Sequence, residues 1–181
     1  MDQPLELLLR HLDDNRAALW DAVDCVPSPL ITRRPAPESW SVAEVLEHLL
    51  LLERRVGALL DRHVATIAER EGPASPIESV DALIDTGRLL DRSRKITTGD
   101  SVQPRGTMDT SQLRASLEES RRTIRETVER CDGLAIETVS IPHVVLGPIN
   151  LYQWIAFVGT HEARHAAQIR EAATLLARGP G

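Results

Sequence analysis

Two histidines four residues apart, His161 and His165, frame the pentapeptide HEARH toward the C-terminal end of the sequence. On a helix this spacing places both imidazoles on one face, one turn apart, where they can bind a single metal ion. The string also fits H-E-x-x-H, the pattern of zinc metalloproteases, in which the glutamate acts as general base. The pentapeptide therefore predicts a metal site and leaves the reaction open.

The residues that follow argue against a protease. Proteases of this type take their third ligand from a later histidine or glutamate, and they also contain a sheet. After His165 the sequence reads AAQIREAATLLARGPG, which has no histidine. Its one acid, Glu171, is six residues on and not on the metal-facing side of the helix. The third ligand is thus expected from upstream.

His48 is the best-placed upstream residue, because it lies between Val45 and Leu52 on the apolar stripe of a predicted helix. A lone histidine on such a stripe is usually a core residue with one hydrogen bond, and H-E-x-x-H strings also occur by chance on surface helices. Two neutral histidines buried a turn apart without a metal or donors would, however, cost free energy. Three histidines directed at one interior favour a metal site.

Helical periodicity in four long segments predicts the elements that hold these histidines. Ser41 and Glu44 form a capping box at the start of the second segment, Asp109 can cap the third, and Pro148 suits the first turn of the last. The predicted helices cover about 3–24, 41–71, 109–130 and 148–177, with a shorter one at about 76–92. The intervening segments 95–108 and 133–147 are expected to be loops, the second with a short extended piece. The fold class is all-α, a four-helix bundle with a short extra helix between the second and third long helices.

Composition predicts an ordinary globular protein of one domain, residues 1–181, with 42% hydrophobic and 27% charged residues. The net charge of −6 argues against a nucleic-acid partner. Thr138–Thr160 lacks charged residues, but Pro142 and Pro148 speak against a membrane span. The N-terminus does not look like a signal peptide, so we expect a cytoplasmic protein in which Cys25 and Cys131 are thiols.

Two stretches carry a family resemblance: SWSVAEVLEHLLLLE at the start of the second long helix and WIAFVGTHEARHAAQI on the last. Together with KITTGDSVQPRGTMDTSQLRASLEESR between them, they resemble the DinB/YfiT-like superfamily over most of the chain. The resemblance implies a four-helix bundle in which His48, His161 and His165 hold one divalent metal. It also implies a homodimer. Relatives in this group include bacillithiol-using S-transferases and mycothiol-dependent isomerases, and many others have no assigned activity.

Three neutral imidazoles would leave the metal its full charge and an open position for a substrate thiolate or water. Zinc or nickel is expected, with iron or manganese as alternatives. We therefore predict a metal-dependent enzyme that transfers a low-molecular-weight thiol to a small electrophile, with no nucleic acid or membrane as partner. A metal-dependent hydrolase and a non-catalytic bundle with a structural metal or a stress-response role are the alternatives.

Supporting roles can be assigned to a few further residues. Glu162 is the candidate general base. The alternative is a surface or dimer-contact carboxylate, because one step along the helix turns Glu162 ~100° away from His161. Gln168, Glu44 and Glu162 are candidates to bond the free ring nitrogens of the ligands. His143 is expected to be a loop residue, with a place at the mouth of the site as the alternative. The remaining expectations concern an exposed His11, packing roles for Trp40 and Trp154, and unreactive thiols at Cys25 and Cys131.

Overall fold

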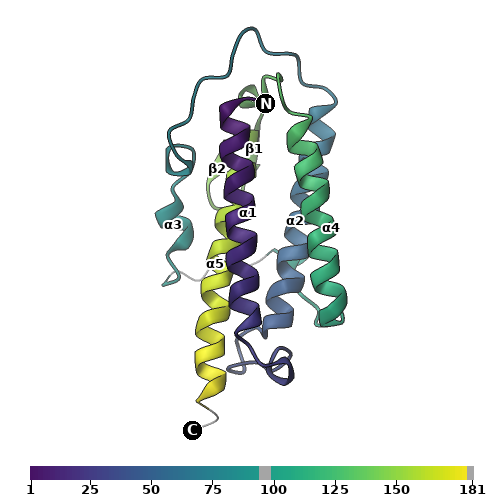
Figure 1. Cartoon of the computed structure of the whole chain (residues 1–181), viewed down its shortest axis with the longest axis vertical. Helices are drawn as coiled ribbons and strands as arrows, with labels where there is room; N and C mark the ends of the chain where they lie inside the picture. The colour runs from purple at the N-terminus through teal and green to yellow at the C-terminus, as the bar shows by residue number, and fades with distance from the viewer. Residues whose placement is uncertain (94–98, 179–181) are drawn as a thin grey trace.

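Four long helices run alongside one another in the computed structural model, which describes residues 1–93 and 99–178 (Figure 1). They are α1 (Gln3–Asp24), α2 (Val42–Val64), α4 (Thr110–Glu129) and α5 (Leu151–Ala177). α1 packs mainly against α5, and α2 mainly against α4. The predicted all-α bundle is confirmed. None of the helices in the described residues is long and apolar enough to cross a membrane.

Side-chain caps explain where these helices begin. Ser41 and Glu44 form the predicted capping box at α2, and Asp109 accepts from the backbone N–H of Ser111 at α4. α5 begins three residues later than predicted, because Asn150 and Gln153 form a second capping box there. Pro148 lies instead in a β-strand.

α2 ends at Val64 rather than near residue 71. The residues beyond it pair with the segment that follows α4: Arg70 N–H donates to Gly133 O over 2.7 Å, and Glu69 and Leu134 form an isolated β-bridge. The backbone groups of these residues are satisfied across the chain, so helix continuation is not needed to pair them.

The connection from α2 to α4 contains the predicted extra helix in a shorter form. Instead of one helix over 76–92, a 3-10 turn at Val80–Ala82 is followed by α3 (Thr86–Leu90). Asp85 separates them because its side chain caps the N–H of Arg88. The predicted loop 95–108 contains a 3-10 turn at Asp100–Val102, and its residues 95–98 lie outside the described residues.

The expected extended piece before α5 is an antiparallel hairpin of β1 (Ser140–His143) and β2 (Gly147–Asn150). His143 pairs with Gly147 at its closed end. Gly147 has a φ of 76°, a left-handed conformation that glycine adopts without strain. The hairpin therefore carries the chain from α4 back to the start of α5.

Two apolar clusters fill the bundle, one built around Leu8, Leu60 and Ile155 and the other around Leu19, Leu50 and Leu117. Four buried charged side chains lie where the clusters meet, one on each long helix. They are Arg16 on α1, Glu53 on α2, Arg121 on α4 and Glu162 on α5. A layer of four charged side chains thus separates the two apolar clusters of the core.

Candidate metal centre

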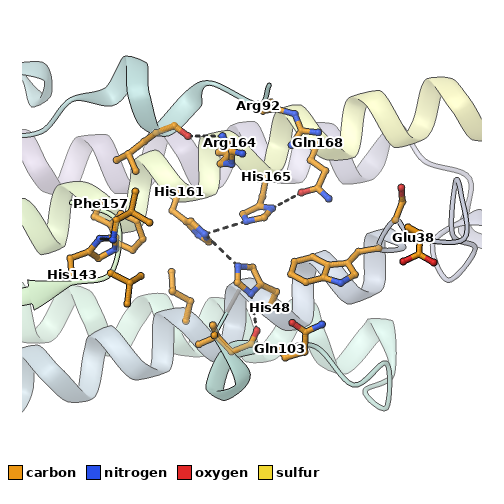
Figure 2. A pocket seen from close by; sticks show the side chains of 18 residues that line it. Glu38, His48, Arg92, Gln103, His143, Phe157, His161, Arg164, His165 and Gln168 are labelled. Carbon is orange, nitrogen blue, oxygen red and sulfur yellow. Dashed lines mark hydrogen bonds between the residues drawn. The ribbon is translucent and has the colours of Figure 1, made fainter. Parts of the chain in front are cut away.

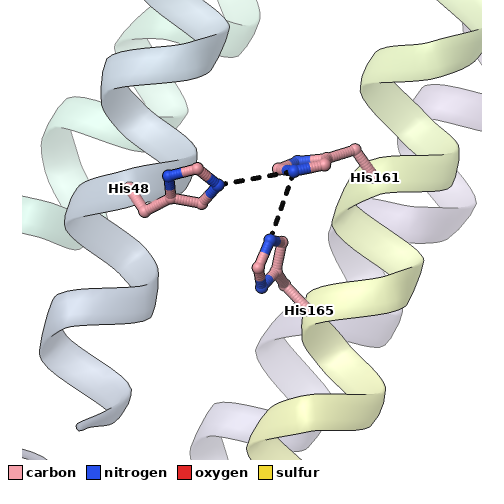
Figure 3. A group of neighbouring side chains, drawn as sticks. All are labelled: His48, His161 and His165. Carbon is pink, nitrogen blue, oxygen red and sulfur yellow. Dashed lines mark hydrogen bonds between the residues drawn. The ribbon is translucent and has the colours of Figure 1, made fainter. Parts of the chain in front are cut away.

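The three predicted histidines meet between α2 and α5 (Figure 3). The Nε2 atom of His161 lies 3.4 Å from Nε2 of His48 and 3.2 Å from Nε2 of His165. All three ligand atoms lie within 4.8 Å of one another, and the side chains of His48 and His165 are buried. The i,i+4 spacing on α5 and the apolar stripe of α2 direct the rings at one point.

Hydrogen bonds fix the tautomers of two of these rings. Nδ1–H of His48 donates to the backbone oxygen of Val102 over 2.8 Å, and Nδ1–H of His165 donates to Oε1 of Gln168 over 2.8 Å. Because the proton of each neutral ring is on Nδ1, each Nε2 presents a lone pair to the shared centre. Gln168 thus makes the predicted hydrogen bond to a free ring nitrogen of the cluster.

Burial keeps all three imidazoles neutral. Desolvation, together with repulsion between the protonated forms of His165 and His48, brings the pKa of His165 to about 3. Desolvation also lowers the pKa of His48, and it takes the pKa of His161 well below its usual value, with additional contributions from His165 and His48. Neutral imidazole is the form that binds a transition metal.

The donor set fits one metal ion. Imidazole nitrogens at about 2.0–2.1 Å from a tetrahedral zinc are about 3.4 Å apart, which is close to the observed 3.2 and 3.4 Å. Without a cation, one N–H on His161 would have to serve the lone pairs of both neighbours. Nδ1 of His161 is itself buried without a partner in the described part of the chain. A cation at the centre would satisfy all three Nε2 atoms at once.

A cavity of about 600 Å³ opens onto the histidines (Figure 2). Its lining includes the apolar side chains of Leu52, Phe157 and Val145 and the polar ones of Arg164 and Gln103. This volume suits a small molecule. Three protein ligands beside such a cavity leave room for a further ligand, as catalytic metal sites do and closed structural sites do not.

The segment after residue 98 forms part of the cavity wall and is tied to α2. Besides the bond from His48 to Val102, the N–H of Gly106 donates to Glu47 over 2.7 Å. Trp40 closes another side, with its ring centroid 5.0 Å from that of His48. Trp40 therefore lines the cavity in addition to packing at the start of α2.

Glu162, the candidate general base, lies apart from the three histidines in the charged layer of the core. Its carboxylate accepts from Arg16 Nε over 2.7 Å and from Arg121 Nη2 over 2.8 Å, and the residue is only 2% exposed. It is neither a surface carboxylate nor part of the cavity lining. One step along the helix rotates the side chain by ~100°, so His161 and Glu162 point to different layers of the core. The position of Glu162 therefore favours a structural role.

One signal in the sequence could have revealed this ion-pair layer. Each of its four members stands three or four residues from apolar residues of its own stripe, as Arg16 does between Leu12 and Leu19. Two arginines and two glutamates on four apolar stripes are balanced in charge, which is the condition for burying them together. Glu53 accepts from both arginines, at 2.6 and 2.8 Å, and completes the set.

The remaining histidines and the two cysteines lie outside the three-histidine cluster. His143 is buried and lines the cavity, so the alternative to a plain loop residue is the one observed. His11 is half-buried rather than exposed, with Nε2 3.2 Å from Ala156 O. Cys25 caps the C-terminus of α1, and burial raises the pKa of Cys131 to about 11. Neither thiol is among the residues that line the cavity.

Comparisons with known proteins give the family. The DinB superfamily profile matches residues 11–169, which include all three histidines. The chain is also similar to the uncharacterized protein YuaE of Bacillus subtilis (strain 168), at 25% identity over 160 residues that cover 88% of this chain and 93% of that protein. No solved structure matches the chain. With its sequence matched over most of its length, the protein belongs to the DinB superfamily.

Proposed function

We propose that this protein is a metal-dependent transferase that joins a low-molecular-weight thiol to a small electrophile. The observation that carries the proposal is the convergence of three neutral Nε2 atoms at the wall of a cavity of about 600 Å³. Zinc or nickel, with iron or manganese as alternatives, is the cation that this donor set suits.

The chemistry follows from the charge of the ligands. Three neutral imidazoles do not reduce the positive charge of a divalent cation, so a thiol bound beside them loses its proton near neutral pH. The thiolate is the nucleophilic form of the group. His48, His161 and His165 would hold the cation, and the orienting bonds of Val102 and Gln168 keep two of these rings in place.

The lining of the cavity favours transfer over hydrolysis. Among the described residues that line it, Glu38 is the only carboxylate, and it is exposed. Attack by water benefits from a positioned general base, whereas a thiolate formed at the cation attacks without one. Apolar side chains such as Leu52 and Phe157 would receive the body of an uncharged electrophile.

A thiol-transfer assay on the zinc- or nickel-loaded protein tests this proposal. The probes are N-acetylcysteine as thiol and 1-chloro-2,4-dinitrobenzene as electrophile, with product absorbance as the readout. We expect turnover by the native protein and a loss of at least ~100-fold in His165→Ala, since one ligand of the cation is gone. His63→Ala, on α2 but outside the cavity lining, is the matched control.

Two results would contradict the proposal. Equal turnover in the native protein and in His165→Ala would show that transfer does not depend on the three histidines. Metal-dependent stability without turnover on any thiol and electrophile pair would instead favour the non-catalytic bundle.

A further inference from the structure

His143 at the end of β1 has a tautomer fixed by the hairpin. Its Nδ1 accepts the backbone N–H of Val145 over 3.2 Å and that of Leu146 over 3.1 Å. A nitrogen that accepts two N–H groups carries no proton, so the proton of the neutral ring is on Nε2. Desolvation lowers the pKa of His143, which keeps the ring neutral at physiological pH.

The ring is also fixed in orientation. It lies edge-on to Trp154 and to Phe157, with centroids 5.0 and 4.4 Å away, and the residue is 9% exposed. The ring centroid of Phe157 in turn lies 5.2 Å from that of His161, so a single aromatic ring separates His143 from the candidate metal centre. An N–H held in this way is preorganised and loses little entropy when it binds an acceptor.

The Nε2–H of His143 is accessible to solvent beside the cavity that this residue lines. In the described part of the chain this N–H has no hydrogen-bond acceptor. Two buried side-chain nitrogens there lack a partner, Trp154 Nε1 and His161 Nδ1, and Nε2 of His143 is not one of them. It therefore reaches solvent, and the cavity that His143 lines is where a nearly buried ring can do so (Figure 2).

We infer that His143 is a specificity-determining residue, whose Nε2–H donates to an acceptor oxygen of the thiol held at the three histidines. The inference rests on the proposed function. The turn itself needs only an acceptor at the Nδ1 position, which a shorter asparagine would supply as it does in many turns. A structural role at the turn does not account for the accessible Nε2–H donor, which has no acceptor in the described part of the chain. An N–H donor at this position would bind an acceptor oxygen, such as that of an amide, several bonds from the sulfur.

Two neutral thiols of the same shape test this selection: 3-mercaptopropionamide, which carries an amide oxygen, and 3-methyl-1-butanethiol, which replaces the amide with a branched alkyl group. The full-length protein is loaded with Co(II), and the sulfur-to-cobalt charge-transfer absorbance is titrated with each thiol. N-acetylcysteamine, whose acceptor lies further from sulfur, extends the range of lengths. We expect an amide-bearing thiol to bind about five- to tenfold more tightly than the alkyl thiol, as one neutral hydrogen bond predicts.

Two variants separate the donor from the turn. In His143→Asn, Oδ1 can still accept from Val145 and Leu146, but the amide nitrogen stops short of the Nε2 position. In His143→Gln, the side-chain nitrogen can reach that position while the acceptor for the turn is displaced. We expect His143→Asn to lose the preference for the amide and to bind the alkyl thiol as before. His143→Gln is expected to keep part of the preference and to have a lower thermal midpoint.

The outcomes distinguish this inference from the function on which it rests. A native protein that binds both thiols equally well, or an unchanged preference in His143→Asn, overturns the role of His143 and leaves the metal-bound thiolate standing. If the only effect of either variant is a lower thermal midpoint in His143→Gln, His143 serves the turn alone, and its proposed role in thiol selection is overturned as well. No charge-transfer band with any thiol in the cobalt-loaded native protein overturns both.

Discussion

Arg16 and Glu162 are 146 residues apart in the chain, and their side chains meet at 2.7 Å in the middle of the bundle. Arg121 and Glu53 complete a closed set of four ion pairs in which both arginines bond both glutamates. Removing one member leaves an uncompensated charge away from water, which is more damaging than the loss of an exposed pair.

We expect Glu162→Gln to lower the free energy of unfolding by about 3–5 kcal/mol. The folded variant should still bind metal, because Glu162 does not contact the three histidines' shared centre or the cavity. Urea unfolding measures the first effect and metal analysis the second. Glu126→Gln removes an exposed partner of Arg122 and should change stability by less than ~1 kcal/mol. A variant of unchanged stability that loses activity would instead restore Glu162 as a general base.

Metal content should depend on His48 and not on other histidines of α2. Elemental analysis of the native protein after incubation with zinc or nickel is expected to give about one equivalent, as a three-ligand centre requires. His48→Ala should lose this metal and His63→Ala should retain it, since only His48 lies within 4.8 Å of the α5 histidines. A native protein free of metal after such incubation would remove the basis of the proposed function.

The bond from His165 to Gln168 should affect metal affinity without changing the fold. Gln168→Met has a similar length but no oxygen to accept Nδ1–H, so we expect the metal dissociation constant to rise about 10- to 100-fold. Gln168→Glu keeps an acceptor and should stay near the native affinity or exceed it. Competition with a chromogenic chelator gives both constants, and equal affinity in the two variants would show that this bond does not orient the ligand.

The metal-free protein should become less stable in mild acid. His165 has a folded-state pKa of about 3, and His48 and His161 are also lowered, whereas each titrates near 6.5 when unfolded. Between these values the unfolded chain binds more protons, so stability is lost as pH falls below about 6.5. Each histidine contributes a slope of about 1.4 kcal/mol per pH unit within its window.

Urea unfolding of the metal-free protein between about pH 7 and 5 checks this slope. His165→Leu should reduce the slope, while His63→Ala should leave it unchanged. A pH-independent stability over this range would mean that the folded and unfolded proteins bind equal numbers of protons, so that burial does not lower the pKa of these histidines.

Close packing of α1 on α5 should make Gly159 intolerant of a methyl group. A Cβ there would lie 2.5 Å from the ring of His11. Alanine in a helix normally adds stability relative to glycine, but here we expect Gly159→Ala to lower the free energy of unfolding by about 1–3 kcal/mol. In a His11→Ala background the same change should be neutral or stabilising, and a double-mutant cycle measures this coupling. An additive result would refute the contact.

The helices and the three histidines were predictable because each depends on local periodicity. An i,i+4 pair on α5 and one stripe residue on α2 have their directions set by the helix itself. Gln168 could be anticipated for the same reason, since it lies three residues from His165 on one face. These positions need only the knowledge that apolar faces turn inward.

The apolar stripes could have shown that the four charged residues are buried, but neither their pairing nor the direction of His143 could be predicted in this way, because both depend on contacts between distant segments. The partners of Glu162 come from α1 and α4, and no local pattern pairs them. The direction of His143 follows from hairpin register and from Phe157 on α5. The end of α2 was mispredicted for a similar reason, since Arg70 pairs with Gly133, which lies far along the chain just after α4.

The three clustered histidines and the rim of the cavity belong to separate parts of the chain. All three histidines are on α2 and α5, whereas Val144, which is 97% exposed, and Val145 belong to the turn of the hairpin. Directed evolution confined to the side chains of residues 144–146 should therefore diversify substrate preference while metal affinity stays constant. The backbone N–H groups that hold His143 would survive such a library, provided that proline is left out of positions 145 and 146.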